Sequence, residues 1–309
     1  MTKSRKTVGQ FLPIAKLFRK LISSCLTHHP NRNLEKCNYW EPRMSNIVDL
    51  ENLFHRSKDR IRDLGEVFTP DSYVEEMLDL LAKDKRGLWS DEEISFFEPC
   101  SGHGNIVLPI YRRRLEGIYK KATTQGLGKT NEASYYAVAN ALNTLWAIDI
   151  DKKNVENCRS RVLSATLDFL KTKLEVKSDI ILFSKKRDFF AHVLSAIKWH
   201  IDENETLSAL SNPENAKTSA NLTKAGAKWF SQNGHLPMDF DLSWVNFYES
   251  CVATKTTPLE YERSLRFIDA ITSGKLRGFE EYEFAKAVIE ITKPQDTARK
   301  PSRSLSAGA

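Results

Sequence analysis

Apolar residues recur at helical spacing in two segments of the first third of the chain. Residues 47–64 place an apolar side chain every three or four positions, and Gly65 ends this pattern. Residues 73–84 repeat the spacing directly after Thr69, Pro70 and Asp71, where a capping residue is followed by a proline near the first turn. The pattern therefore predicts two amphipathic helices joined by a turn.

A short β-branched and aromatic run follows the second of these helices. Residues 94–97 predict a strand, which leads through the glycine-bearing loop 98–105 into an apolar helix at 106–122. Strand, glycine-bearing turn and helix in this order are typical of the first unit of a doubly wound sheet.

The alternation of strands and helices continues toward the middle of the chain. Polar residues separate the segments, and 123–132 reads as a surface loop. The expected elements are a helix at 133–143, a strand at 145–150, a helix at 155–174, a strand at 179–184 and a helix at 191–201. This order predicts an α/β fold with a Rossmann-like, doubly wound sheet and N-terminal helices.

The last third of the chain is less regular. We expect an exposed excursion at 202–239 with a weak helix at 223–230, a fourth strand in 240–248, helices at 259–271 and 280–291, and a disordered tail at 293–309. One α/β domain is therefore expected over 44–292.

Composition narrows the class of protein only modestly. The 309 residues carry a formal charge of +6, which favours an acidic partner such as nucleic acid but equally fits a solvated basic surface. The cysteines show no CxxC pairing, so we expect no metal site, no disulfide framework and a reducing, cytoplasmic location. The apolar stretch 11–22 is too short and too charged to cross a membrane, and 1–43 reads as a poorly ordered basic extension.

The loop 98–105 and the end of the strand 145–150 carry the candidate chemistry. Gly102 and Gly104 lack a Cβ, so the main chain at these positions is able to approach a ligand closely, although a tight packing turn explains them equally well. Asp149 makes the pattern more specific, because an acid at the tip of the following strand is where nucleoside-binding α/β sheets hold the ribose hydroxyls.

The chain resembles the amino-methylating, adenine-specific DNA methyltransferases of restriction-modification systems, in particular the type I modification subunit and its single-chain relatives. Three segments carry the resemblance, in the family's order and spacing: GEVFTPDSYVEEMLDLL (65–81), FFEPCSGHGNIVLPIYRRRL (96–115) and LWAIDIDKKNVENCRSRV (145–162). The resemblance covers roughly residues 60–190 and implies a methyltransferase-like domain that binds S-adenosylmethionine.

The resemblance also implies which residues bind the cofactor. Phe68, Thr69 and Pro70 correspond to the turn beside the methionine end, and Asp149 and Ile150 to the ribose acid and an adenine contact. Asp188 and Phe189 are similar to a pair that contacts adenine, but an ordinary helix start explains them equally well. The loop around the amino-acid moiety would consist of Glu98, Pro99, Cys100, Ser101, Gly102, Gly104 and Asn105, with His103 as a tolerated substitution.

The family's catalytic sequence, similar to Asn-Pro-Pro-Tyr, does not occur in this chain. That loop accepts hydrogen bonds from the target amino group while its aromatic ring stacks on the extruded base. Ser211 to Glu214 supply an asparagine and one proline, whereas Asn246, Phe247 and Tyr248 follow a strand-like run and supply an amide with two rings. We prefer Asn246 to Tyr248 as catalytic residues, against the alternative that they form a strand end with core aromatics.

The expected function is therefore methyl transfer from S-adenosylmethionine to the exocyclic amino group of adenine in DNA, by direct displacement. The alternative is a catalytically degraded cofactor- or DNA-binding subunit of a restriction or antirestriction complex. Methylation of RNA or protein is the third reading. Few residues follow Tyr248, so a specificity or target-recognition subunit is a possible partner besides DNA. For Arg112, Arg113 and Arg114 a solvated helix face is favoured over phosphate contacts.

Overall fold

The computed structural model describes residues 12–13, 69–126, 130–210, 223–240, 243–257 and 259–273. The first helix expected from the sequence, the helix at 280–291, the basic extension and the C-terminal tail lie outside these residues. Within the described residues the fold is mixed α/β and mostly helical, with a small parallel sheet.

The sheet consists of three short parallel strands in chain order. These are β2 (Phe96–Glu98), β3 (Leu145–Asp149) and β4 (Ile201–Glu203), and the two residues of β1 (Leu12–Pro13) pair with β2 on its other side. In the register, Phe96 lies opposite Leu145 and Ala147 opposite Ile201. The expected α/β class is confirmed, whereas the Rossmann-like, doubly wound arrangement stays a prediction.

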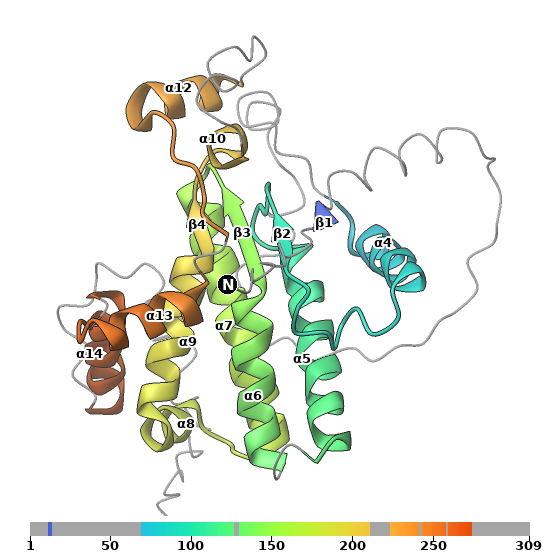
Figure 1. Ribbon diagram of the computed structural model, residues 1–309, viewed down its shortest axis with the longest axis vertical. Coiled ribbons are helices and arrows are strands. Elements are labelled where there is room, and N and C mark those ends of the chain that lie inside the picture. Colours follow the sequence, from blue (N-terminus) through green and yellow to red (C-terminus); the bar gives the residue numbers. More distant parts are fainter. Residues whose placement is uncertain are drawn as a thin grey trace, which may run out of the picture.

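Helices connect the strands and cover one face of the sheet. α5 (Val107–Thr124) and α6 (Thr130–Asn143) join β2 to β3. α7 (Lys152–Leu174), α8 (Asp179–Lys185) and α9 (Arg187–His200) join β3 to β4. Figure 1 shows these helices extending to one end of the molecule, away from the carboxyl ends of the strands.

Further helices surround this unit. α4 (Asp71–Asp84) precedes β2, α10 (Thr206–Leu210) and α12 (Lys224–Asn233) follow β4, and α13 (Trp244–Ala253) and α14 (Leu259–Ser273) come last. In Figure 1, α10 and α12 lie beyond the carboxyl ends of the strands, whereas α13 and α14 lie toward the opposite end. No helix among the described residues has the length and apolar character needed to cross a membrane.

The alternation of side chains along the strands divides the core into two parts. Phe96, Leu145 and Ile201 join the large cluster that the helices build on one face. Phe97 and Trp146 face the other side, where Phe240 packs edge-on against both rings at centroid distances of 4.7 and 5.6 Å. Both faces of the sheet are therefore buried, which explains why β2 and β3 appear in the sequence as continuous apolar runs.

The expected strand at 179–184 is wrong, because these residues form the helix α8. Asp179, Leu182 and Phe183 are buried together on one helix face, whereas Ile181 is 43% exposed. This is helical spacing, and a short apolar run does not by itself distinguish a helix from a strand. The strand that follows β3 in the chain and in the sheet is instead β4, at Ile201–Glu203.

The expected strand in 240–248 is also wrong, because α13 begins at Trp244. Ser243 precedes the helix, and its hydroxyl accepts a hydrogen bond from the Asn246 N–H at 3.4 Å, which is the position of a helix N-cap. The other helices expected within the described residues are confirmed, and the weak helix near 223–230 is α12. They are α4, α5, α6, α7, α9, α12 and α14.

Candidate functional site

The loop that follows β2 is held against β3 and packs directly on α7. The Ser101 N–H donates to the Ile148 carbonyl at 2.8 Å, and the Gly104 N–H donates to the Ser101 carbonyl at 2.9 Å. Gly104 has a φ of +96°, and a Cβ at this position would lie 2.9 Å from the Sγ of Cys158 on α7. The close approach of loop and helix therefore requires glycine here.

Asp149, at the end of β3, ties this loop to the start of α7. Its Oδ2 accepts a hydrogen bond from the Gly102 N–H at 2.8 Å, and its Oδ1 accepts from the Asp151 N–H at 2.8 Å and the Asn154 amide at 3.3 Å. An ionised carboxylate accepts about four hydrogen bonds. Asp149 is therefore oriented by the fold and retains capacity for a further O–H donor.

Glu98 places a second carboxyl group at the neighbouring strand end. It is only 7% exposed, and its Oε1 accepts a hydrogen bond from the Cys100 N–H at 3.2 Å. Burial raises the pKa of Glu98 to about 7, while the Cys100 N–H lowers it and the charge of Asp149 raises it further. Burial is also the main cause that raises the pKa of Asp149. A buried acid and a partly buried acid thus lie at adjacent strand ends.

The carboxyl ends of the parallel strands form one edge of the sheet. The end of β4 and the start of α10 complete this edge, and no sequence pattern indicates them. The Asn204 N–H donates to the Asp149 carbonyl at 3.1 Å. The Thr206 hydroxyl donates to the Pro99 carbonyl at 2.6 Å and lies 3.3 Å from the Cys100 Sγ. α10 is therefore attached to the glycine loop from a position 107 residues away in the chain.

Arg161 on α7 connects the loop to the turn before α4. Its Nη1 donates to the His103 carbonyl at 3.0 Å and to the Asn105 Oδ1 at 2.9 Å, and the Asn105 amide donates to the Thr69 carbonyl at 3.4 Å. His103 is buried, which agrees with a packed loop position. This network holds the loop and the Thr69–Pro70 turn together.

Most of the cofactor residues expected from the sequence therefore lie at one edge of the sheet. Phe68 lies outside the described residues. The residues that the described fold gathers around the ends of β2 and β3 are Thr69, Pro70, Glu98, Pro99, Cys100, Ser101, Gly102, Gly104, Asn105, Asp149 and Ile150.

Asp188 and Phe189 are not brought to this edge. They lie in the first turn of α9, and the helix runs for 14 residues before β4 begins. At 1.5 Å per residue this is about 20 Å of helix between the pair and the amino end of β4. Phe189 packs against Tyr135 on α6, with ring centroids 4.8 Å apart. The pair is an ordinary helix start.

Asn246 also lies away from the glycine loop. The Trp244 N–H donates to the His200 Nε2 at 3.0 Å, and the Val245 N–H donates to the Asn143 Oδ1 at 3.4 Å. Asn143 and His200 come just before β3 and β4, so α13 begins near the amino ends of the strands. The structure therefore places Asn246 near the amino ends of the strands, whereas Gly102 and Asp149 lie at the carboxyl ends.

The structure does not describe the side chains of the other candidate catalytic residues. Phe247 and Tyr248 belong to α13, but their side chains are not among those described, and neither are Ser211 to Glu214. The described part of the chain thus brings no aromatic acceptor loop to the ends of β2 and β3.

The chemistry of the edge favours a ligand with hydroxyl and cationic groups. Asp149 has acceptor capacity, Glu98 lies next to it, and burial raises the pKa of Glu203 at the end of β4 as well. Within the described ranges no group of three or more His, Cys, Asp and Glu is placed to hold a metal ion. In a comparison with known proteins, no family model, curated protein or solved structure matches the chain.

Proposed function

We propose that the chain binds S-adenosylmethionine at the glycine loop and serves the methylation of the exocyclic amino group of adenine in DNA. The observation that carries this proposal is the connection of Gly102 to Asp149 at 2.8 Å, which joins the loop and the strand-end acid of the sequence motif in one site. When bound, this cofactor supplies an electrophilic methyl group on a sulfonium ion.

The residues of the edge fit this cofactor in charge and in hydrogen bonding. A ribose has two hydroxyl donors, and Asp149, which already accepts three hydrogen bonds, retains acceptor capacity for one of them. A sulfonium and an ammonium group are cations, and Glu98 supplies a nearby carboxyl group in a dry environment, where electrostatic attraction is strong. Arg161 would hold the loop in place through His103 and Asn105.

Because the pKa of Glu98 is raised, we predict that rising pH has opposite effects on the stability of the fold and on the affinity for S-adenosylmethionine. The pKa of Glu98 is raised from 4.5 to about 7, so the folded protein holds a proton that the unfolded chain has lost in this interval. Its contribution to stability is therefore complete below about pH 4.5 and is lost as the pH rises to about 7. Affinity for the cationic cofactor should instead rise several-fold as the pH passes through 7, because Glu98 then becomes ionised.

Denaturant unfolding and isothermal titration of S-adenosylmethionine across this pH interval measure both effects. Glu98→Gln should flatten the two pH profiles and weaken binding at high pH. An affinity that falls with rising pH, or a Glu98→Gln profile identical to that of the wild type, would show that Glu98 does not face the cation.

The position of α13 predicts that Asn246 takes no part in methyl transfer. Asn246→Ala should leave the rate of tritiated-methyl transfer to mixed-sequence DNA within about twofold of the wild type, because Asn246 is exposed and α13 begins at the amino ends of the strands. Asn212→Ala tests the other asparagine in the same assay. A loss of transfer of about 100-fold or more in Asn246→Ala, on the order of 3 kcal/mol, would restore Asn246 as a catalytic residue.

The same position of Asn246 favours a second candidate function, a cofactor- or DNA-binding subunit of a restriction or antirestriction complex. Such a subunit would bind S-adenosylmethionine without transferring its methyl group alone. Cofactor binding without transfer by the purified chain, with transfer restored by a partner subunit, would support this second function over the first.

A further inference from the structure

A basic hollow lies against the later turns of α5, beyond the glycine loop, and the proposed function leaves it unused. It has a volume of about 400 Å³ and is formed by the end of α4, the connection to β2 and the last turns of α5. Its lining includes Lys85, Arg86, Lys120 and Lys121 and contains no Asp or Glu. The lining is therefore strongly positive in charge.

The wall of the hollow is held in a fixed shape by a buried cation. Arg114, fully buried on α5, donates from Nη1 to the Leu88 carbonyl at 3.3 Å and to the Asp91 carbonyl at 2.5 Å. The segment also lies very close to α5 at Gly117, where a Cβ would meet the Trp89 carbonyl oxygen at 2.6 Å. The basic hollow is thus part of the packed fold, with the positions of its backbone defined.

Among the described residues, most of the cations that line the basic hollow have no ion-pair partner. Lys121 forms an ion pair with Glu92, which lies beside the hollow. For Lys85, Arg86 and Lys120 the described part of the chain provides no ion-pair partner. With respect to the described side chains, these three cations are therefore the groups that would meet an anionic ligand.

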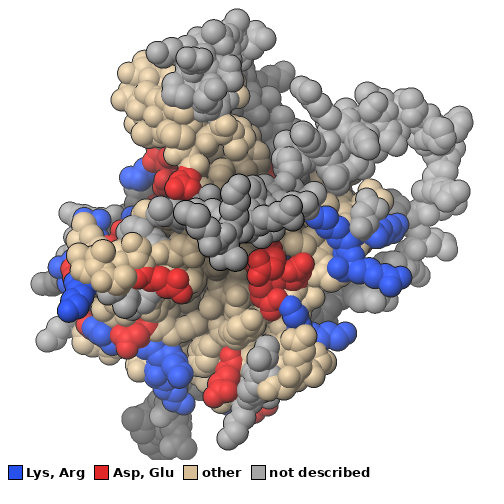
Figure 2. All heavy atoms as spheres, viewed as in Figure 1, with Lys and Arg blue, Asp and Glu red and all other residues tan. Residues whose placement is uncertain are grey.

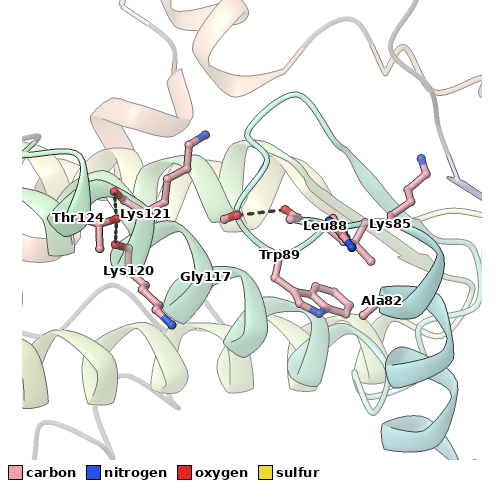
Figure 3. A pocket seen from close by; sticks show the side chains of 11 residues that line it. Ala82, Lys85, Leu88, Trp89, Gly117, Lys120, Lys121 and Thr124 are labelled. Atoms are coloured by element: carbon pink, nitrogen blue, oxygen red, sulfur yellow. Dashed lines mark hydrogen bonds between the residues drawn. The ribbon is translucent and has the colours of Figure 1, made fainter.

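The arrangement of the cations indicates an extended anion rather than a single small one. Figure 3 shows the side chains of Lys120 and Lys121 extending in opposite directions from α5, and that of Lys85 on the other side of the hollow, at the end of α4. The floor between them includes Leu88 and Trp89, and the face of Trp89 is already covered by Arg113 at 5.3 Å. Separated cations suit successive phosphates of a polymer, whereas one phosphate ion needs converging donors.

We propose that the basic hollow binds the phosphodiester backbone of nucleic acid. Gly117 and Thr124 in its lining lie on α5, 13 and 20 residues after Gly104, so the hollow lies about 20–30 Å from the glycine loop. A duplex presents phosphates over this distance, with one charge per about 1.7 Å of its axis. Figure 2 shows that Lys and Arg side chains gather on the side of the molecule where α4 lies. Only the identification of the polymer as DNA rests on the proposed function.

The test compares two triple variants of the full chain. Lys85→Ala/Arg86→Ala/Lys120→Ala removes the available cations and keeps Lys121, whose loss would leave Glu92 without its partner. The matched control, Lys177→Ala/Lys185→Ala/Lys224→Ala, removes the same charge from exposed positions elsewhere. Fluorescence anisotropy with a labelled mixed-sequence duplex measures affinity between about 50 and 200 mM salt.

The expected result is a loss of affinity of about tenfold or more in the hollow variant and a decrease of about 2 to 3 in the slope of log affinity against log salt. The control should keep the slope of the wild type. Equal slopes in the two triple variants, or no binding of DNA or RNA by the wild type, would overturn the proposal. So would displacement of the duplex by millimolar inorganic phosphate at constant ionic strength, which would identify a site for a single small anion.

Thermal unfolding distinguishes binding of nucleic acid from a purely structural role of the same cations. The cations lie near the ends of α4 and α5, where they offset the negative helix ends. A purely structural role would lower the thermal midpoint without changing the salt slope, and this outcome would contradict the proposal. Lys120→Gln alone provides a milder variant for the comparison.

Titration of S-adenosylmethionine into the hollow variant separates the basic hollow from the cofactor site. The affinity should match that of the wild type, because the substituted side chains lie away from the glycine loop. If neither protein binds the cofactor while the salt slopes still differ, the proposed function fails and the basic hollow stands.

Discussion

Gly104→Ala is expected to destabilise the protein by about 2–6 kcal/mol and to abolish binding of S-adenosylmethionine. The new Cβ would lie 2.9 Å from the Cys158 Sγ, a distance that forces the loop or α7 to move. The φ of +96° is also a conformation that alanine rarely adopts. Steric overpacking and backbone strain each cost about 1–3 kcal/mol.

Denaturant unfolding measures the loss of stability, and isothermal titration measures the loss of binding. Gly102→Ala is the matched control, because its Cβ would meet no atom within 4 Å and only its φ of +52° is unfavourable. Adding Cys158→Ala to Gly104→Ala should restore part of the stability, since it removes the clashing sulfur atom. If Gly104→Ala is as stable as Gly102→Ala, the loop does not pack on α7 as described.

Asp149→Ala is expected to weaken binding of S-adenosylmethionine by at least about 100-fold, on the order of 3 kcal/mol. The substitution removes the acceptor proposed for the ribose hydroxyls and also leaves the N–H groups of Gly102 and Asp151 without their acceptor. Losing a partner of this kind costs about 1–3 kcal/mol for each buried group. A decrease in stability should therefore accompany the decrease in affinity.

Asn154→Ala separates the two contributions. It removes the side-chain amide that donates to Asp149 at 3.3 Å, the longest of the three hydrogen bonds on Asp149, and leaves the carboxylate in place. Its affinity should stay within about tenfold of the wild type. Isothermal titration of S-adenosylmethionine into the wild type and the two variants shows whether Asp149 contacts the cofactor. If Asp149→Ala binds the cofactor as tightly as Asn154→Ala, Asp149 is excluded as a ligand contact.

The parts of the fold with a strong local pattern were predictable from the sequence. β2 and β3 are buried on both faces, so they appear as apolar runs, and α4 buries Val74, Met77, Leu78 and Leu81 at helical spacing. β4 has no such pattern, because it is last in the sheet order and buries only Ile201, while Asp202 is exposed. Its three residues therefore resemble the start of a polar excursion.

The candidate site divides in the same way between local and distant contributions. The glycine loop and Asp149 were predictable because each lies beside a strand that the sequence indicates. Arg161 and Thr206 were not, because they hold the loop through backbone carbonyls 58 and 107 positions away in the chain. Contacts of this kind depend on the tertiary fold and leave no spacing in the sequence.

Binding of S-adenosylmethionine at the edge formed by the glycine loop and Asp149 underlies the proposed function, and isothermal titration into the purified full chain decides it. The titration is made at about pH 8, where Glu98 is ionised. We expect saturable binding of one cofactor per chain, which Asp149→Ala removes. A folded protein that gives no heat of binding and no thermal stabilisation by millimolar cofactor would show that this edge is not a site for S-adenosylmethionine.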